Sequence, residues 1–109
     1  MINKILTASG VKYRRGRFLR PPAGTYAVYT DDVSTDGPDG IPCIFTHDCT
    51  VEVYEPTPDD AVEAAIEEAL IEAGLQWTKQ DRYWLQDEQR YQVIYEFTYI
   101  TKRRILTNG

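Results

Sequence analysis

The segment from Thr57 to Gly74 constrains the fold most, because its pattern predicts one amphipathic helix over residues 58–73. Thr57 is expected to be the N-cap and Pro58 the first helical residue, where a missing backbone N–H costs nothing. Gly74 is expected to end the helix in the left-handed conformation. The apolar residues recur at helical spacing and form one stripe: Val62, Ala65, Ile66, Ala69, Leu70 and Ala73. The glutamates are expected on the opposite, solvated face: Glu63, Glu67, Glu68 and Glu72.

Two long segments alternate in the way that predicts half-buried strands. Residues 44–55 place His47, Cys49, Val51 and Val53 on one face, and residues 90–102 do the same with Tyr91, Val93, Tyr95, Phe97 and Tyr99. We interpret the second row as core rather than as a platform that stacks the bases of a nucleic acid. An unbroken final strand would span roughly 40 Å, which exceeds what a small core needs. Part of it should therefore project, or pair with something outside the domain.

Shorter segments complete the expected fold. Residues 26–29, 75–78 and 82–85 predict short strands, and residues 2–9 predict a short first helix that ends at Gly10. The order of these segments predicts an α+β fold, an antiparallel sheet of about four to five strands with the helix 58–73 packed on it. A length of 109 residues fits a single domain over residues 1–109.

The charges are segregated along the chain. The basic N-terminal segment, residues 1–24, contains six Lys or Arg and no acid, whereas residues 31–72 contain thirteen Asp or Glu and no Lys or Arg. Within the basic segment we single out Arg14, Arg15 and Arg17 as candidate interaction residues. A solvated surface that pairs with acids of the same chain or of a neighbour is favoured over a nucleic-acid contact of residues 12–20, because the net charge of −5 opposes general attraction for phosphate.

Residues 31–42 are expected to form a flexible acidic loop, because Asp, Ser, Gly and Pro dominate them. The acids of this loop are the other candidate interaction residues: Asp31, Asp32, Asp36 and Asp39. A calcium loop that begins at Asp32 is not supported, because its twelfth position is Cys43 instead of a bidentate glutamate.

No residue pattern predicts catalysis or a cofactor. Cys43, His47 and Cys49 lack a fourth ligand and the paired spacing of structural zinc sites, and the two cysteines would lie roughly 20 Å apart on a strand, too far for a disulfide. There is no Gly-rich phosphate loop, and a single His leaves no base for a serine triad. No apolar run approaches the about 18 residues of a membrane span. We therefore expect a soluble non-enzyme with no cofactor, no metal and no membrane contact.

A family resemblance supplies the functional prediction. The features that carry it lie within residues 22–102. They are, in order, the segment 25–29, an Asp- and Gly-rich loop, the segment 50–54, a helix with Glu67 near its middle, Gly74 and the segment 91–99. This succession resembles the small tail terminator (tail completion) proteins of long-tailed bacteriophages and prophages. It covers about three-quarters of the chain, and the strongly cationic N-terminal segment departs from it.

The resemblance implies a structural virion protein that is made in the host cytoplasm. It would assemble as a homohexameric ring on the head-proximal end of the tail tube, stop tube growth and present a surface to the head completion or connector protein. DNA would pass through the lumen without specific binding. The alternatives are a head completion or neck connector protein, a nucleic-acid-binding module that uses residues 12–20, or a small hot-dog-like enzyme with Asp59 or Asp60 as its base.

Overall fold

The computed structural model describes residues 1–41 and 43–103 of the chain. The elements are, in order, α1 (Ile2–Ser9), β1 (Lys12–Arg15), β2 (Tyr26–Asp36), the 3₁₀ turn η1 (Pro38–Gly40), β3 (Ile44–Glu55), α2 (Asp60–Glu72), β4 (Trp77–Lys79), β5 (Tyr83–Leu85) and β6 (Arg90–Lys102). The expected α+β class is confirmed, and so are both helices and the two long strands β3 and β6.

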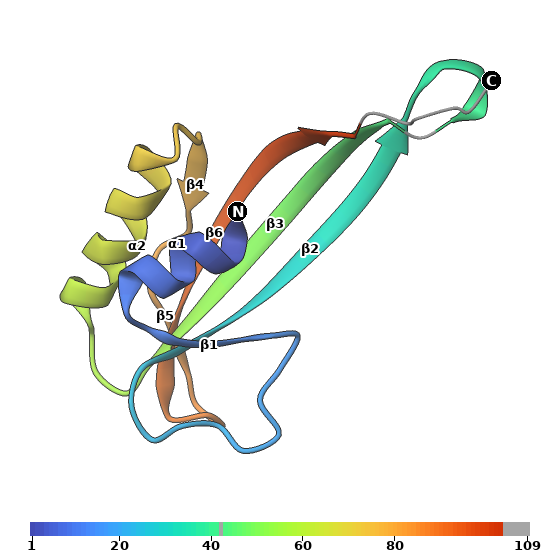
Figure 1. Ribbon diagram of the computed structural model, residues 1–109. Coiled ribbons are helices and arrows are strands. Elements are labelled where there is room, and N and C mark those ends of the chain that lie inside the picture. Colours follow the sequence, from blue (N-terminus) through green and yellow to red (C-terminus); the bar gives the residue numbers. More distant parts are fainter. Residues whose placement is uncertain (42, 104–109) are drawn as a thin grey trace.

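The sheet has six strands and is mixed, so the expected antiparallel sheet of four to five strands was wrong in two respects. Its order is β1-β2-β3-β6-β4, and β5 pairs with β6 beyond the end of β4 (Figure 1). β1 runs parallel to β2, with Lys12 opposite Tyr26, whereas every other pair is antiparallel. The two strands are parallel because the connection between them returns the chain to the level of the first residue of β1 before β2 begins.

That connection is held by specific contacts even though its sequence is polar and rich in proline. The Arg90 guanidinium donates hydrogen bonds of 2.8–3.0 Å to the carbonyl oxygens of Pro22, Ala23 and Gly24. Phe18 packs edge-on against Tyr26, with ring centroids 5.3 Å apart. The start of the final strand therefore fixes the connection that precedes the second strand.

Both helices cover one face of the sheet, which we call the covered face (Figure 1). Ile66 and Leu70 of α2 and Leu6 of α1 are completely buried there, against completely buried Val51 of β3 and Tyr95 of β6. The predicted apolar stripe of α2 is thus confirmed as core. The interpretation of the β6 aromatic row as core is confirmed for Tyr95 and Phe97.

The first turn of α2 differs from the prediction. The N-cap is Asp59, whose Oδ1 accepts a 3.1 Å hydrogen bond from the backbone N–H of Val62, and Pro58 lies outside the helix. Asp59 is held for this role because its other carboxylate oxygen accepts a 2.6 Å hydrogen bond from the Thr25 hydroxyl. Thr57 therefore does not cap the helix. The predicted end is confirmed, since Gly74 adopts a left-handed φ of 72°.

Replacing Asp59 with alanine is expected to lower the free energy of unfolding by about 0.5–2 kcal/mol, because the backbone N–H of Val62 loses its acceptor. Thr57→Ala is the matched control, since that residue makes no capping hydrogen bond in α2, whose cap is Asp59. Urea unfolding of the two variants would measure the difference. A larger loss for Thr57→Ala than for Asp59→Ala would contradict the observed cap.

Past the pairing with β1 and β4, three strands continue as a projecting arm, which we define as residues 30–36 of β2, 44–48 of β3 and 98–102 of β6 (Figure 1). It accounts for the elongated shape, with principal extents of 57 × 29 × 21 Å. The prediction that part of β6 projects is confirmed, and its partner along the arm is β3. The predicted flexible loop was wrong for residues 31–36, because they pair with β3 as far as Asp36 opposite Ile44. Pro42, in the same predicted loop, lies outside the described residues.

Candidate interaction surface

The base of the arm is tied together on the covered face by the only histidine of the chain. The Nδ1 atom of His47 lies 3.0 Å from a carboxylate oxygen of Asp31, and its Nε2 atom lies 2.9 Å from the Thr101 hydroxyl. The imidazole also stacks on Tyr99, with centroids 4.3 Å apart. Because Asp31, His47 and Thr101 come from β2, β3 and β6, this network holds the three strands in register where they leave the helices.

Asp31, one of the candidate interaction residues, is engaged within the protein by His47. It also lies 3.6 Å from the Cys49 sulfur. Burial and the neighbouring Asp31 carboxylate raise the pKa of the Cys49 thiol to about 12, so the thiol is protonated and a poor nucleophile at neutral pH. Cys43 and Cys49 are both free, as expected. The part of the chain that the structure describes contains no group of three or more His, Cys, Asp or Glu placed to hold a metal ion.

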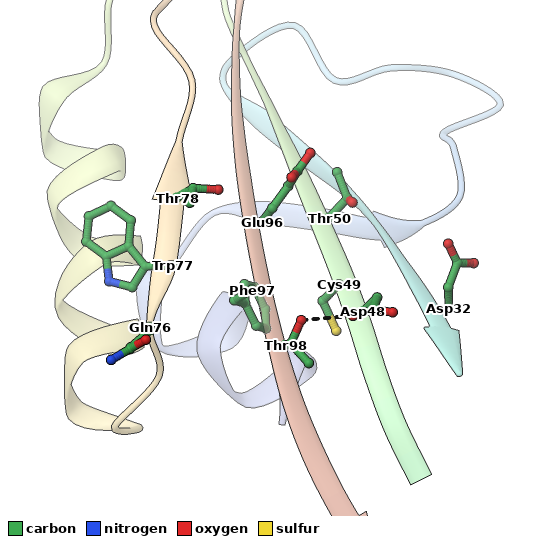
Figure 2. A pocket seen from close by; sticks show the side chains of 10 residues that line it. All are labelled: Asp32, Asp48, Cys49, Thr50, Gln76, Trp77, Thr78, Glu96, Phe97 and Thr98. Atoms are coloured by element: carbon green, nitrogen blue, oxygen red, sulfur yellow. Dashed lines mark hydrogen bonds between the residues drawn. The ribbon is translucent and has the colours of Figure 1, made fainter. Parts of the chain in front are cut away.

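The opposite face of the sheet, which we call the open face, contains a shallow pocket whose lining includes hydroxyl groups and carboxylates (Figure 2). Asp32 and Asp48 stand directly opposite each other in the β2–β3 register, and Asp48 accepts a 2.8 Å hydrogen bond from Thr98. Glu96 lies on the same surface, and the lining includes no Lys or Arg. Like charges directly opposite each other destabilise a sheet, so this arrangement is not explained by stability. Asp32, where the rejected calcium loop would begin, alternates with Ser34 and Asp36 along β2 instead of starting a loop.

The predicted arginines lie on the β1 side of the sheet. Arg14 and Arg15 end β1, Arg17 follows it, and all three are exposed. These three arginines form no ion pair with any acid among residues 1–41 and 43–103. The basic segment therefore does not neutralise the acidic half of its own chain in the described structure.

The two sides of the arm end in strand edges, which the sequence analysis did not identify. Along residues 30–36, β2 pairs only with β3 among the described residues, and the same holds for residues 98–102 of β6. The β2 edge carries Asp31, Asp32 and Asp36, whereas the β6 edge ends in Lys102 and Arg103 without an acid. The excess length of residues 90–102 was the one signal in the sequence that pointed to these edges.

A buried ionic cluster lies under the start of α2, where the enzyme alternative would have placed its base. Asp59 is used as the helix cap, and the exposed Asp60 pairs with Arg82 at 2.8 Å. Glu63, predicted on the solvated face, is only 4% exposed and lies 2.7 Å from Arg82 and 2.9 Å from Lys79. These two cations neutralise the buried carboxylate of Glu63. Glu55 at the end of β3 is completely buried beside them. Each of these acids is engaged within the protein, and Glu55 has no access to a substrate.

No protein-family model matches this chain, and no curated protein matches it either. Within the described residues, neither helix is long and apolar enough to cross a membrane.

Proposed function

We propose that this protein is a structural ring subunit, a tail terminator that caps the head-proximal end of a bacteriophage tail tube and forms part of the head–tail joint. The observation that carries the proposal is the three-stranded arm, which extends past β1 and β4 with a strand edge on each side. A subunit with two different edges on opposite sides can join identical copies head to tail, and such contacts close into a ring when the rotation between copies allows it.

The open face supports the same function. Carboxylates of Asp32, Asp48 and Glu96 lie on it beside threonine hydroxyls, and the pocket there has no cationic lining residue. A channel lined by such a surface would repel the DNA phosphates and let DNA pass without binding. The exposed arginines of β1 lie at the side of the sheet, where they are available to a neighbouring subunit. The virion, at the junction of tail and head, is the location that follows from this function.

The proposal predicts that the purified protein binds only the ends of tail tubes. Electron microscopy of tubes mixed with the protein should show one ring at one end of each tube. Reversing Arg14 and Arg15 to Glu should weaken ring assembly roughly tenfold, as expected for the loss of two exposed charge pairs of up to about 1 kcal/mol each. Reversing Lys4 and Arg20 to Glu changes the net charge equally and serves as the control. Binding along the whole tube, or no binding to tubes, would refute the terminator function.

A further inference from the structure

We infer that neighbouring copies join edge to edge, with residues 30–36 of β2 in one copy adding as a parallel strand to residues 98–102 of β6 in the next. The inference rests on the proposed ring and names the surfaces that form it. Both segments have β3 as their only described strand partner, so the backbone N–H and C=O groups on their outward sides are available. Such groups on a strand edge are a template for another strand.

The charges on the two edges select which edges meet. Two β2 edges paired about a twofold axis at Ser34 would bring Asp32 of one copy against Asp36 of the other, and two β6 edges paired in the same way at Ile100 would place Lys102 opposite Thr98, with no acid to meet it. Like charges oppose the pairing of two β2 edges, and the mixed pairing is the one that brings acid against base. The edges therefore favour a head-to-tail contact over a twofold dimer.

The register within one subunit fixes the level at which these charges meet. Asp36 and Lys102 both stand opposite Ile44, from the two sides of β3. Because β3 is antiparallel to both neighbours, β2 and β6 run parallel to each other. A second copy placed at the same height around a ring axis would thus bring its β2 parallel to β6, with its Asp36 level with Lys102. Ser34 would then lie beside Ile100, since both stand opposite Thr46.

Below the arm, the two sides of the subunit also carry opposite charges. Arg14 and Arg15 lie on β1, next to β2. At the other side of the sheet, α2 is tied to β4 by the 2.8 Å ion pair between Lys79 and Glu67, and Glu68 and Glu72 of this helix are exposed. The displacement that joins the arms therefore also brings the β1 side of one copy, where Arg15 shares the covered face with Tyr29, toward the α2 side of the next.

Disulfide trapping tests this contact directly. Ser34→Cys and Ile100→Cys, introduced together with Cys43→Ser, place two exposed thiols on the open face. Within one subunit β3 separates them, so their Cα atoms lie about 10 Å apart, too far for a disulfide. Across the proposed contact the spacing would be about 4.8 Å, within the range of a disulfide. Cys49 is retained, because the residue is only 2% exposed. The control pairs Ser34→Cys with Thr78→Cys, an exposed residue of β4 that stands opposite Glu96, four residues before Ile100 and outside the arm.

Mild oxidation of the concentrated protein should link the Ser34–Ile100 variant into a ladder of covalent oligomers that ends at the ring size. The control pair and the single variants should remain monomeric under denaturing electrophoresis. Asp36→Lys or Lys102→Asp alone should reduce the yield roughly threefold to fivefold, and the two together in one chain should restore it, because every contact then regains one pair of opposite charges.

The outcomes separate the inference from the function on which it rests. Dimers from a single-cysteine variant would indicate symmetric pairing and would overturn the inference. Rings that are seen by light scattering but do not form the Ser34–Ile100 link would overturn it too. A protein that stays monomeric and unlinked up to its solubility limit would overturn it as well. Rings that cap tube ends without this link would leave the terminator function intact, and linked rings that ignore tube ends would refute that function alone.

Discussion

Replacing Leu70 with alanine is expected to lower the free energy of unfolding by about 2–5 kcal/mol, because the side chain is completely buried and its loss leaves a cavity between α2 and the sheet. For a chain of this size, that loss corresponds to a melting temperature lower by roughly 10 °C or more. The neighbouring residue supplies the control: Ile71 is 65% exposed, and Ile71→Ala should change stability by less than about 0.5 kcal/mol. Equal melting temperatures for the two variants would contradict the placement of α2 on the sheet.

The second large effect is expected from Glu55, which ends β3 in the buried cluster. Its Oε1 atom accepts a 3.2 Å hydrogen bond from the backbone N–H of Asp59 and lies 3.4 Å from Arg82 Nε. Its Oε2 atom is buried and has no N–H or O–H donor among the described residues. Burial without a donor at Oε2, beside the Glu63 carboxyl group, therefore favours the protonated form of Glu55. Other charged groups at the cluster are Asp60 and Glu67 of α2, and Lys79.

The two carboxyl groups titrate in opposite directions. Burial and the hydrogen bond shared with Glu63 raise the pKa of Glu55 to about 8. Burial acts in the same direction on Glu63, but hydrogen bonds with Glu55, Lys79 and Arg82 outweigh it and lower the pKa of that carboxyl. Between pH 4.5 and about 8 the folded chain thus retains a proton on Glu55 that the unfolded chain has released. The stabilisation that this proton provides is lost as the pH rises through that window, by at most about 1.4 kcal/mol per pH unit.

We therefore expect the free energy of unfolding to fall from about pH 5 to pH 8, and Glu55→Gln to remove most of that slope. Glutamine keeps the acceptor for the Asp59 N–H and can donate to Glu63 without a titrating proton. At about pH 9 the variant should be more stable than the unmodified protein by more than about 1 kcal/mol. Glu68→Gln, at an exposed position of α2, serves as the control and should leave the slope unchanged. Parallel pH profiles for Glu55→Gln and the unmodified protein would show that Glu55 does not carry the shared proton.

The candidate surface was predictable only in its charges. The exposed positions of Arg14, Arg15, Asp32 and Asp36 agree with what their residue types predict. Asp31 differs, because His47 and Cys49 on the neighbouring strand provide partners that no local pattern reveals. Only the excess length of residues 90–102 pointed to the strand edges in the sequence, since an edge is defined by the strand that is absent beside it.

The sequence by itself determined the elements whose signal is local. The apolar stripe of α2, its end at Gly74, and the bounds of β3 and β6 follow from side-chain periodicity and from one left-handed glycine, which depend on neighbouring residues alone. The tertiary structure decided the features in which distant residues compete with local preference. Asp, Ser and Thr favour turns by small local energies, yet residues 31–36 form a strand because β3 offers a complete ladder of backbone hydrogen bonds. In the same way, cations brought in by the segment after α2 allow Glu63 to be buried, and Thr25, far away in sequence, helps to make Asp59 the cap.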